Sequence, residues 1–399
     1  MPESRVDVVI LGAGIMGCAL AHHLAARQVG PVVVYDPATP SAGATGRAAG
    51  IVTEQLWNAW DVAVTRESKE QYAELAARAE PGTYRVNGFA RWTRDAEAAR
   101  ILADSVERLR GWGVDVRPIG PDELARRLPA GRFEDVEGAI FGPSDAVVTP
   151  STITEQYAES ARAAGVDFTF GVPMRSLARE IGGWALELPG RTVRARRLVV
   201  AAGAWSKRLL AGLGHALPLV PYRTQAAVLR PGTPTPDTLP SGHDLDTDVY
   251  ARPEAAGRIL AGDGTDLREA DPETFSPGGD ERFVGHLAET FAHRFPGWAD
   301  AELVRAWAGV ITATPDRRPI IGPVDSSEGL FAITGFNGFG VMRAGGAASR
   351  LAELMARSDG GTEGLDALSP VLPERFVGRS LEFVPRPGFT LEGGDAPRF

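Results

Sequence analysis

The chain has 399 residues, of which 44% are hydrophobic and 23% charged, and this composition excludes a disordered or fibrous protein. Its 51 acidic and 42 basic side chains give a net charge of −9, which argues against nucleic acid or an anionic membrane as the main partner. The single cysteine and six histidines lack a metal-binding spacing, so we expect neither a disulfide scaffold nor a metal site. The most apolar stretch, residues 8–21, is too short for a membrane span. We expect a cytoplasmic protein with more than one domain.

A complete βαβ unit is predicted at the N-terminus. Residues 6–11 predict a buried strand, residues 18–27 a helix and residues 31–35 a second strand. The GAGIMG turn at residues 12–17 joins the first strand to the helix, and Asp36 closes the second strand. Glycines in this context let the backbone approach a pyrophosphate, while an acid at this distance binds ribose hydroxyls and repels a 2′-phosphate. The pattern therefore predicts a site for FAD or NAD rather than NADP.

Further glycine-rich segments follow along the chain. Residues 41–50 form a loop of small and hydroxyl side chains that suits close approach to a phosphate or a flat ring system. A strand predicted at residues 197–202 stops at Gly203, as if to make room for a ligand. Residues 330–334 predict a strand, and the glycine-rich turn after it starts a helix at residues 341–355. The N-terminus of that helix is suited to face an anionic group.

The segments between these glycine-rich loops predict a second domain of helix and antiparallel strands. Residues 96–112 predict an amphipathic helix, and residues 224–229, 248–251 and 258–261 predict strands separated by turns rich in proline and glycine. The fold class we expect is α/β, with a Rossmann-like nucleotide-binding domain and an inserted α+β substrate domain built on an antiparallel sheet. The expected limits are 1–84, 143–215 and 305–375 for the nucleotide-binding domain, 85–142 and 216–304 for the substrate domain, and 376–399 for a surface tail.

Together the motifs resemble the D-amino-acid oxidase family of FAD-dependent oxidoreductases, in the branch of glycine oxidase, sarcosine oxidase and sarcosine dehydrogenase. The resemblance covers about residues 6–354. The motifs that carry it are GAGIMG at 12–17 with Asp36, GATGRAAG at 43–50, VVAAGAWS at 199–206, ATPDRRPIIGP at 313–323 and TGFNGFG at 334–340. Because each motif stands where the family has it in chain order, FAD is expected rather than NAD.

The resemblance also implies which residues hold the cofactor. The ADP half is assigned to Gly12, Gly14, Gly17, Asp36 and Met174, the pyrophosphate and isoalloxazine to Thr45, Gly46 and Arg47, and the N1/C2=O edge of the flavin to Gly338, Gly340 and Met342. Ala202 and Gly203 are expected beside the dinucleotide, and the other expected cofactor-binding residues are Ile15, Met16, Gly50, Phe339 and Val341. Some relatives bind FAD through a cysteine near the segment that corresponds to residues 309–316, which has none here. We therefore expect FAD to be non-covalent and the lone Cys18 to be a packed apolar side chain.

The substrate side departs from the family pattern. Ile311 and Met342 stand where relatives place an arginine or a lysine that grips a substrate carboxylate, and residues 259–261 are apolar where sarcosine oxidases have an oxygen-activating lysine. The remaining candidates for the catalytic and substrate pocket are Tyr250, Arg252, Trp307, Ile311, Phe336, Asn337, Phe339 and Arg343. For Arg252 and Arg343, anion binding competes with a structural ion pair. Asn337 contacts either ligand or its own turn, and the aromatic residues are either pocket walls or core.

The resemblance implies oxidation of a C–N bond of an amine or amino acid derivative to an imine, by hydride transfer to flavin N5 followed by hydrolysis. The expected partners are a small-molecule amine and, as electron acceptor, O2 or an electron-transfer partner. One alternative is a dehydrogenase that oxidises the C–O bond of a 2-hydroxy acid, which is disfavoured because Phe339 stands where many relatives have a basic histidine. Another is a non-catalytic flavin-binding subunit. The sequence leaves the amine, the acceptor and the oligomeric state open.

Overall fold

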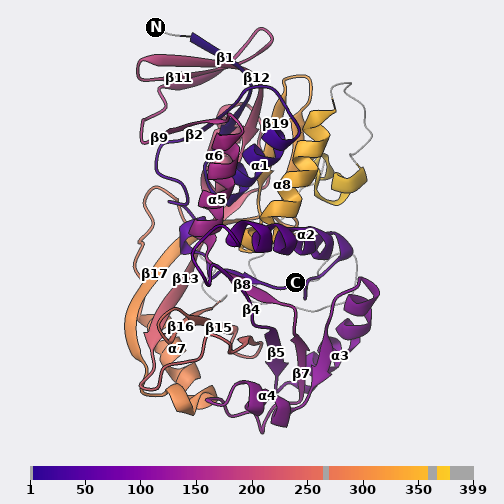
Figure 1. Ribbon diagram of the computed structural model, residues 1–399, viewed down its shortest axis with the longest axis vertical. Coiled ribbons are helices and arrows are strands. Elements are labelled where there is room, and N and C mark those ends of the chain that lie inside the picture. The colour runs from indigo at the N-terminus through magenta and orange to yellow at the C-terminus, as the bar shows by residue number, and fades with distance from the viewer. Residues whose placement is uncertain (1–2, 264–268, 358–365, 378–399) are drawn as a thin grey trace.

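The computed structural model describes residues 3–263, 269–357 and 366–377. These residues form an upper and a lower lobe, each built on an eight-stranded sheet, with helix α2 (Ala59–Ala76) lying between them in the view of Figure 1. The expected tail from residue 378 onward lies outside the described residues. Phe376, where that tail was placed to begin, packs into the core of the upper lobe.

The sheet of the upper lobe is parallel at its centre. Its central strands lie in the order β9 (Asp167–Phe170), β2 (Val32–Asp36), β1 (Glu3–Leu11), β12 (Arg191–Val200) and β19 (Leu330–Thr334). Antiparallel strands β10 (Ser176–Glu180), β11 (Gly183–Leu188) and β18 (Ile320–Asp325) extend it. The runs of β-branched residues in β1 and β2 suit strands that are covered on both faces. The expected Rossmann-like α/β architecture is confirmed.

Helices cover one face of this sheet. They are α1 (Ile15–Ala26), α5 (Pro150–Ala163) and α8 (Gly340–Ala356), and α2 packs against α8. The short helix α6 (Ser206–Gly212) lies in the other core layer with β10 and β11. Helix α1 begins at Ile15, three residues before the expected start, because the helix continues the glycine turn directly and its last glycine lies inside the first turn. Strand β1 likewise begins at Glu3 rather than at residue 6.

The sheet of the lower lobe has the strand order β17 (Glu302–Ala313), β13 (Val220–Arg230), β16 (Arg258–Asp263), β15 (Val249–Glu254), β14 (Ser241–Asp244), β5 (Phe89–Thr93), β7 (Gly138–Gly142) and β6 (Arg117–Ile119). Neighbours are antiparallel except β5 and β14, which are parallel. The predicted antiparallel sheet is thus confirmed, with one parallel pair of strands. Strand β17 carries this sheet beyond residue 304, where the sequence places the end of the substrate domain.

The remaining elements join the lobes or cover the lower sheet. Strands β3 (Ile51–Val52), β8 (Ala146–Val148) and β4 (Tyr84–Val86) form a small third sheet. Helices α3 (Ala96–Gly111), α4 (Pro121–Arg127) and α7 (Glu281–Arg294) pack on the lower sheet. Among the described residues, no helix has the length and apolar character needed to cross a bilayer.

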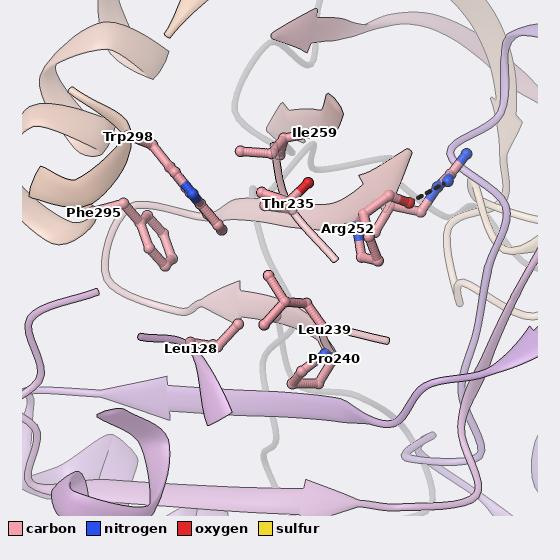
Figure 2. Close-up of a pocket in the computed structure, with 11 residues that line it drawn as sticks. Leu128, Thr235, Leu239, Pro240, Arg252, Ile259, Phe295 and Trp298 are labelled. Atoms are coloured by element: carbon pink, nitrogen blue, oxygen red, sulfur yellow. Dashed lines mark hydrogen bonds between the residues drawn. The ribbon is translucent and has the colours of Figure 1, made fainter. Parts of the chain in front are cut away.

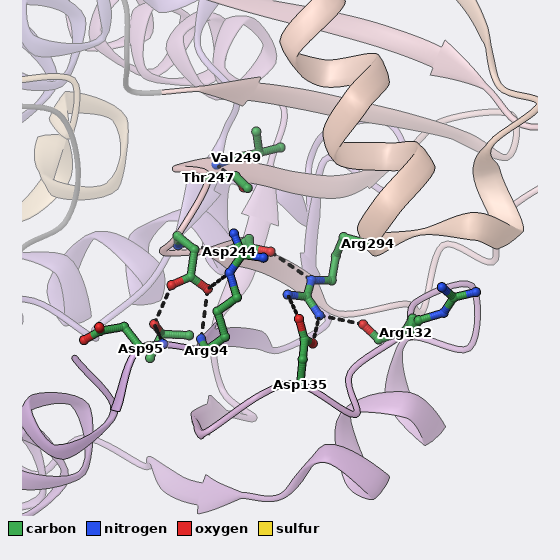
Figure 3. A network of polar contacts seen from close by, with 10 residues as sticks. Arg94, Asp95, Arg132, Asp135, Asp244, Thr247, Val249 and Arg294 are labelled. Atoms are coloured by element: carbon green, nitrogen blue, oxygen red, sulfur yellow. Dashed lines mark hydrogen bonds and ion pairs between the residues drawn. The ribbon is translucent and has the colours of Figure 1, made fainter. Parts of the chain in front are cut away.

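Strand register gives the lower sheet two distinct faces. Because side chains alternate along each strand, Val249 and Trp92 share the outer face, where they pack in one cluster with Phe291 of α7. On the same face Arg294 holds the carboxylates of Asp244 and Asp135 (Figure 3). We call the opposite face, which is turned toward the upper lobe, the inner face; it carries Tyr222, Trp307, Ile311, Tyr250, Leu260 and His243.

Candidate cofactor and substrate site

The GAGIMG turn leaves no room for side chains at two of its glycines. Gly12 has φ +112°, and a Cβ there would lie 2.5 Å from the carbonyl oxygen of Ala201 at the end of β12. A Cβ on Gly17 would lie 1.9 Å from the carbonyl oxygen of Gly12. The Asp36 carboxylate accepts a hydrogen bond from the Ala13 N–H at 2.8 Å, so it fixes the turn. The N-terminus of α1 is thereby held at the carboxyl ends of β1, β2 and β12.

The loop at residues 41–50 folds onto this turn. The Thr45 hydroxyl accepts from the Ile15 N–H at 3.1 Å, and the Ser41 N–H donates to the Ala13 carbonyl at 3.2 Å. A Cβ on Gly46 would lie 2.5 Å from the Ser41 carbonyl oxygen. The Ser41 hydroxyl is buried without a hydrogen-bond partner among the described residues. A buried orphan hydroxyl beside a glycine turn is suited to accept a cofactor's polar group.

Other residues assigned to the cofactor lie at the same edge of the upper sheet. Met174 lies beside the end of β2, where the Tyr35 hydroxyl donates to the Val172 carbonyl at 2.8 Å. Ala202 follows β12, and the next residue, Gly203, has φ +50° and no atom within 4 Å of its Cβ position. The structure therefore brings these residues together with the glycine turn and leaves the Gly203 backbone open to a ligand.

The C-terminal glycine turn, residues 335–340, lies next to the N-terminal turn of α1. Gly338 is exposed with φ +85°, and α8 begins at Gly340 without a side-chain cap. The Cβ position of Gly340 lies 3.5 Å from the Met16 side chain of α1, so the N-terminal turns of α1 and α8 are neighbours. Met342 is buried, and only its backbone can face a ligand. Two helix N-termini at one place favour negative charge, as on a pyrophosphate or the N1 edge of a reduced flavin.

The inner face of the lower sheet covers these loops. The Trp307 indole N–H donates to the Arg47 carbonyl at 3.0 Å, and the Arg47 side chain is turned back onto its own loop, donating to the Gly43 carbonyl at 3.0 Å. Ile311 is half-buried and reaches within 3.1 Å of the Cβ position of Gly338. Trp307 and Ile311 therefore face the nucleotide-side loops, as predicted for walls of a pocket.

The side chain of Tyr250 lies over Gly262 on the neighbouring strand β16. A Cβ on Gly262, its partner on β16, would lie 2.2 Å from the Tyr250 hydroxyl. Alanine or a larger residue at this position would displace the ring, so Gly262 determines where the phenol lies. Burial and the nearby Asp263 carboxylate raise the pKa of Tyr250. The phenol therefore remains protonated at neutral pH.

Both candidate arginines have carboxylate partners within the fold. The Arg252 guanidinium is buried, pairs with Glu254 at 2.7 Å and donates to the carbonyls of Pro253 (2.8 Å) and Ala49. In Figure 2 it points away from the small apolar cavity between Trp298 and Ile259. Burial lowers its pKa, and Glu254 opposes that shift. These contacts favour the structural ion pair over anion binding for Arg252, because all three guanidinium nitrogens already have a partner within the fold.

Arg343 and Asn337 have structural partners as well. Arg343 is fully buried, pairs with Asp61 of α2 and donates to the carbonyls of Phe336 at 2.9 Å and Phe339 at 3.2 Å. The Asn337 amide accepts from the Thr314 N–H at 3.0 Å and donates to the Gly335 carbonyl at 2.7 Å. Both side chains thus hold the flavin-edge turn in place. These partners favour the structural alternative for both side chains, and the packing of Phe336 in the buried core favours the core alternative for its ring.

Trp57, Tyr222, His243 and Asp248 lie at the site but were missed from the sequence. Trp57 meets Phe339 edge-to-face at 4.8 Å between ring centroids. Tyr222 is the register partner of Ile311, and burial raises the pKa of its phenol to about 12. His243 is the register partner of Tyr250 and contacts Asp248 at 2.9 Å. Strand alternation from Tyr250 could have indicated Asp248, whereas the other three depend on long-range pairing.

Cys18 does not take part in the site chemistry. It is fully buried in α1, and burial raises the pKa of its thiol to about 12. The prediction of a packed apolar side chain is confirmed. Because it is the only cysteine, no thioether link to a flavin is available at residues 309–316.

The chain matches the family model DAO, FAD dependent oxidoreductase, over residues 7–354. It is 26% identical over 376 residues to human mitochondrial dimethylglycine dehydrogenase, covering 88% of this chain and 42% of that protein. It is 25% identical over 389 residues to glycine oxidase of Geobacillus kaustophilus, covering 94% and 98%. The structure of L-proline dehydrogenase from P. horikoshii superposes with a TM-score of 0.85 at 23% identity, covering 94% and 98%. The chain thus spans less than half the length of the curated dehydrogenase it matches.

The fold and the converging glycine turns define a dinucleotide-binding flavoprotein. The chain belongs to the family of FAD-dependent oxidoreductases described by the DAO model, and its cofactor is FAD. The residues present fit that cofactor: the Ser41 hydroxyl lacks a partner, the Gly203 backbone is open and the N-terminus of α8 is uncapped. Asp36, Thr45, Gly338 and Gly340 are among the residues that would hold FAD. The family assignment made from the motifs is confirmed.

Proposed function

We propose that the protein oxidises the C–N bond of an amine to an imine, which water then hydrolyses. Bound FAD would supply the hydride-accepting chemistry. Relatives named dimethylglycine dehydrogenase and glycine oxidase support oxidation next to a nitrogen. The observation that supports the proposal most is the close approach of the apolar Ile311 side chain to the turn at Gly338, since an uncharged wall beside the flavin edge suits a neutral amine.

Apolar walls favour the reactive form of an amine. An alkylamine has a pKa of about 10, so most of it is protonated at neutral pH. The protonated form has no lone pair to expel a hydride. Trp57, Phe339, Ile311 and Trp307 are half-buried apolar side chains grouped around the cofactor loops. Desolvation by such a surface disfavours the ammonium form and lowers the pKa of the bound amine. The protein would therefore activate its substrate by dehydration rather than with a catalytic base.

Tyr250 fits this scheme as a hydrogen-bond donor and a wall. Its raised pKa keeps the proton on the phenol, so it is a poor general base. Tyr250→Phe should leave flavin reduction within about tenfold of the wild-type rate, measured by anaerobic stopped flow. A loss greater than about a thousandfold would require a direct acid–base role for this residue.

The lack of a side chain assigned to bind a substrate carboxylate favours a larger or carboxylate-poor amine over a small amino acid. Arg252 and Arg343 are held by Glu254 and Asp61, and Ile311 is apolar. We expect glycine and sarcosine to reduce the flavin poorly, whereas secondary amines with an apolar or extended substituent should reduce it well. Reduction by glycine or sarcosine at micromolar concentrations would contradict this preference. The rate of reoxidation by O2, compared with that by an artificial acceptor, would identify the class of electron acceptor.

Oxidation of a C–O bond is a second candidate, favoured by one observation. The His243–Asp248 pair lies on the inner face beside Tyr250, and such a pair is able to accept a hydroxyl proton. Anaerobic mixing of the holoprotein with an amine panel and a 2-hydroxy-acid panel separates the two functions. Bleaching of the visible flavin band by amines alone supports our proposal, and bleaching by hydroxy acids alone contradicts it. Bleaching by neither class would indicate the non-catalytic subunit.

A further inference from the structure

The β14–β15 hairpin carries two buried carboxylates that face opposite sides of the lower sheet. Asp244 on the outer face accepts from Arg294 Nε at 3.0 Å (Figure 3), and that arginine also holds Asp135. Asp248 belongs to the inner face because its partner, His243, is in register with Tyr250. The outer carboxylate therefore has a full cationic partner, whereas the partner of the inner one within the described part of the chain is an imidazole.

Asp248 is held in an unusual way for a buried acid. The residue is 9% exposed and has φ +56°, a left-handed conformation that costs free energy outside glycine. Its Oδ1 lies 2.9 Å from His243 Nε2, while its Oδ2 is buried without a hydrogen-bond partner among the described residues. A buried carboxylate oxygen without a partner is costly unless a ligand satisfies it.

Asp248 lies on the substrate side of the flavin-edge turn. Its charge contributes to raising the pKa of both Tyr250 and Tyr222, in addition to the larger effect of burial. Tyr222 is the register partner of Ile311, which contacts the Cβ position of Gly338. Through His243, Asp248 therefore belongs to the same face of the sheet as Tyr222 and Ile311.

The arginines near the site are held by other groups of the fold. Arg252 and Arg343 have carboxylate partners within the fold. The charge of Arg317 reaches Tyr222, but Arg317 has a partner of its own. Asp248 is thus a carboxylate on the inner face whose Oδ2 has no hydrogen-bond partner among the described residues. The reacting nitrogen must be neutral to release a hydride, so this oxygen is suited to a different, cationic group of the same substrate.

We propose that Asp248 is a specificity-determining residue that binds a second, protonated nitrogen of the substrate, so that the protein acts on diamine-type secondary amines rather than on amino acids. This inference rests on the proposed amine oxidation. His243 would orient the carboxylate, and Oδ2 would accept the ammonium hydrogen bond. Hydrogen bonds that involve a charged group are strong enough to change selectivity by about 10- to 100-fold.

The test compares three secondary amines of similar length with the FAD-loaded protein under anaerobic single-turnover conditions. N-methylputrescine carries a distal ammonium, N-methylpentylamine a neutral end and γ-methylaminobutyrate a carboxylate. We expect the ratio of reduction rate to dissociation constant to be about 10- to 100-fold higher for N-methylputrescine than for the neutral amine, and lowest for the carboxylate. The absence of any preference for the diamine would overturn the inference.

Asp248→Asn tests the residue itself. Asparagine is isosteric and tolerates the left-handed conformation, so the turn should persist. We expect the ratio of the diamine to the neutral amine to fall by about 10- to 100-fold. The matched control is Asp246→Asn in the same turn, where the carboxylate binds Thr93 and the Arg94 N–H instead; it should keep the preference. A preference that survives in Asp248→Asn would refute the proposal.

Two further results keep this inference separate from the proposed function. Failure of all three amines to bleach the flavin would contradict amine oxidation, whereas bleaching without a charge preference would contradict only the role of Asp248. If Asp248→Asn fails to fold, the wild type still gives an answer. tert-Butylammonium, which donates N–H hydrogen bonds but has no hydrogen on the carbon next to its nitrogen, should perturb the visible flavin spectrum at a concentration about tenfold or more below that of tert-butanol, and equal affinities would refute the proposal.

Discussion

The nucleotide-side loops and the inner face of the lower sheet meet at one site but recognise ligands with different parts of the chain. The loops at residues 12–17 and 335–340 present backbone N–H groups and helix N-termini, and their glycines meet neighbouring backbone or side chains. The inner face presents side chains such as Tyr250, Trp307 and Asp248, whose directions follow from strand register. Cofactor binding therefore tolerates few backbone changes, whereas the substrate side can change its chemistry one side chain at a time.

The largest expected effect is on the nucleotide side. Gly17→Ala places a methyl group 1.9 Å from the Gly12 carbonyl oxygen, so α1 must move away from the turn. We expect the purified variant to have lost most of its visible flavin absorbance, or to be insoluble. The matched control is Gly285→Ala inside α7, where no atom lies within 4 Å of the new Cβ; there the better helix propensity of alanine should stabilise the protein by about 1 kcal/mol. Full flavin content in Gly17→Ala would contradict the role of this glycine.

His23 of α1 provides a test by pH. Burial lowers the pKa of His23 to about 4, and its ring nitrogen lies 3.0 Å from the Gln71 side-chain oxygen. The unfolded chain binds this proton near pH 6.5 and the folded protein does not, so stability falls as the pH drops from 6.5 toward 4. The loss should reach roughly 3 kcal/mol.

Urea unfolding at several pH values measures this loss. His23→Gln should flatten the dependence over that range, whereas His293→Gln, at an exposed position of α7, should leave the dependence as in the wild type. An unchanged slope in His23→Gln would show that another group causes the acid sensitivity.

On the inner face the effect should fall on turnover and spare the cofactor. Gly262→Ala places a methyl group 2.2 Å from the Tyr250 hydroxyl and displaces the ring. We expect flavin reduction to slow by up to about a hundredfold, because small misplacements at a site can have this effect, with normal flavin content. Gly278→Ala is the control, since no atom lies within 4 Å of its new Cβ. Loss of FAD in Gly262→Ala would contradict the separation of cofactor binding by the nucleotide-side loops from substrate binding by the inner face.

The smallest expected effect concerns the aromatic wall. Trp57→Leu removes the edge-to-face contact with Phe339, which is worth about 0.5–1.5 kcal/mol. The dissociation constant of an apolar secondary amine should rise about threefold to tenfold, measured from the concentration dependence of flavin reduction. Trp60→Leu, which removes an indole that donates to the Ala367 carbonyl at 2.8 Å, should leave amine binding unchanged. Equal effects in both variants would remove Trp57 from the substrate site.

The same division explains how much the sequence alone could predict. The glycine turns were readable because their steric requirement is local: Gly12 and Gly17 meet backbone only a few residues away or at the next strand end. The architecture followed from the alternation of apolar strands and helices. Tyr250, Trp307 and Ile311 were placed on one face, and the register confirms this.

The charged side chains could not be assigned in the same way. The role of Arg343 depends on Asp61, which is far away in the sequence and adjacent only after α2 packs on α8. Arg252 had a local signal in Glu254, which alternation places on the same side of the strand. Trp57 and His243 reach the site through pairings across the fold. A side chain's chemistry is visible in the sequence, but its availability depends on which neighbours the fold brings to it.

The central claim is that a neutral amine transfers hydrogen from the carbon next to its nitrogen while it lies between the inner face and the flavin edge. The most direct test is anaerobic stopped-flow reduction of the holoprotein by a secondary amine, either normal or deuterated at that carbon. We predict a single phase of flavin bleaching that is slower for the deuterated amine, with one aldehyde and one amine released per flavin. Bleaching that is absent with every amine, or insensitive to deuterium at that carbon under single-turnover conditions, would contradict the account.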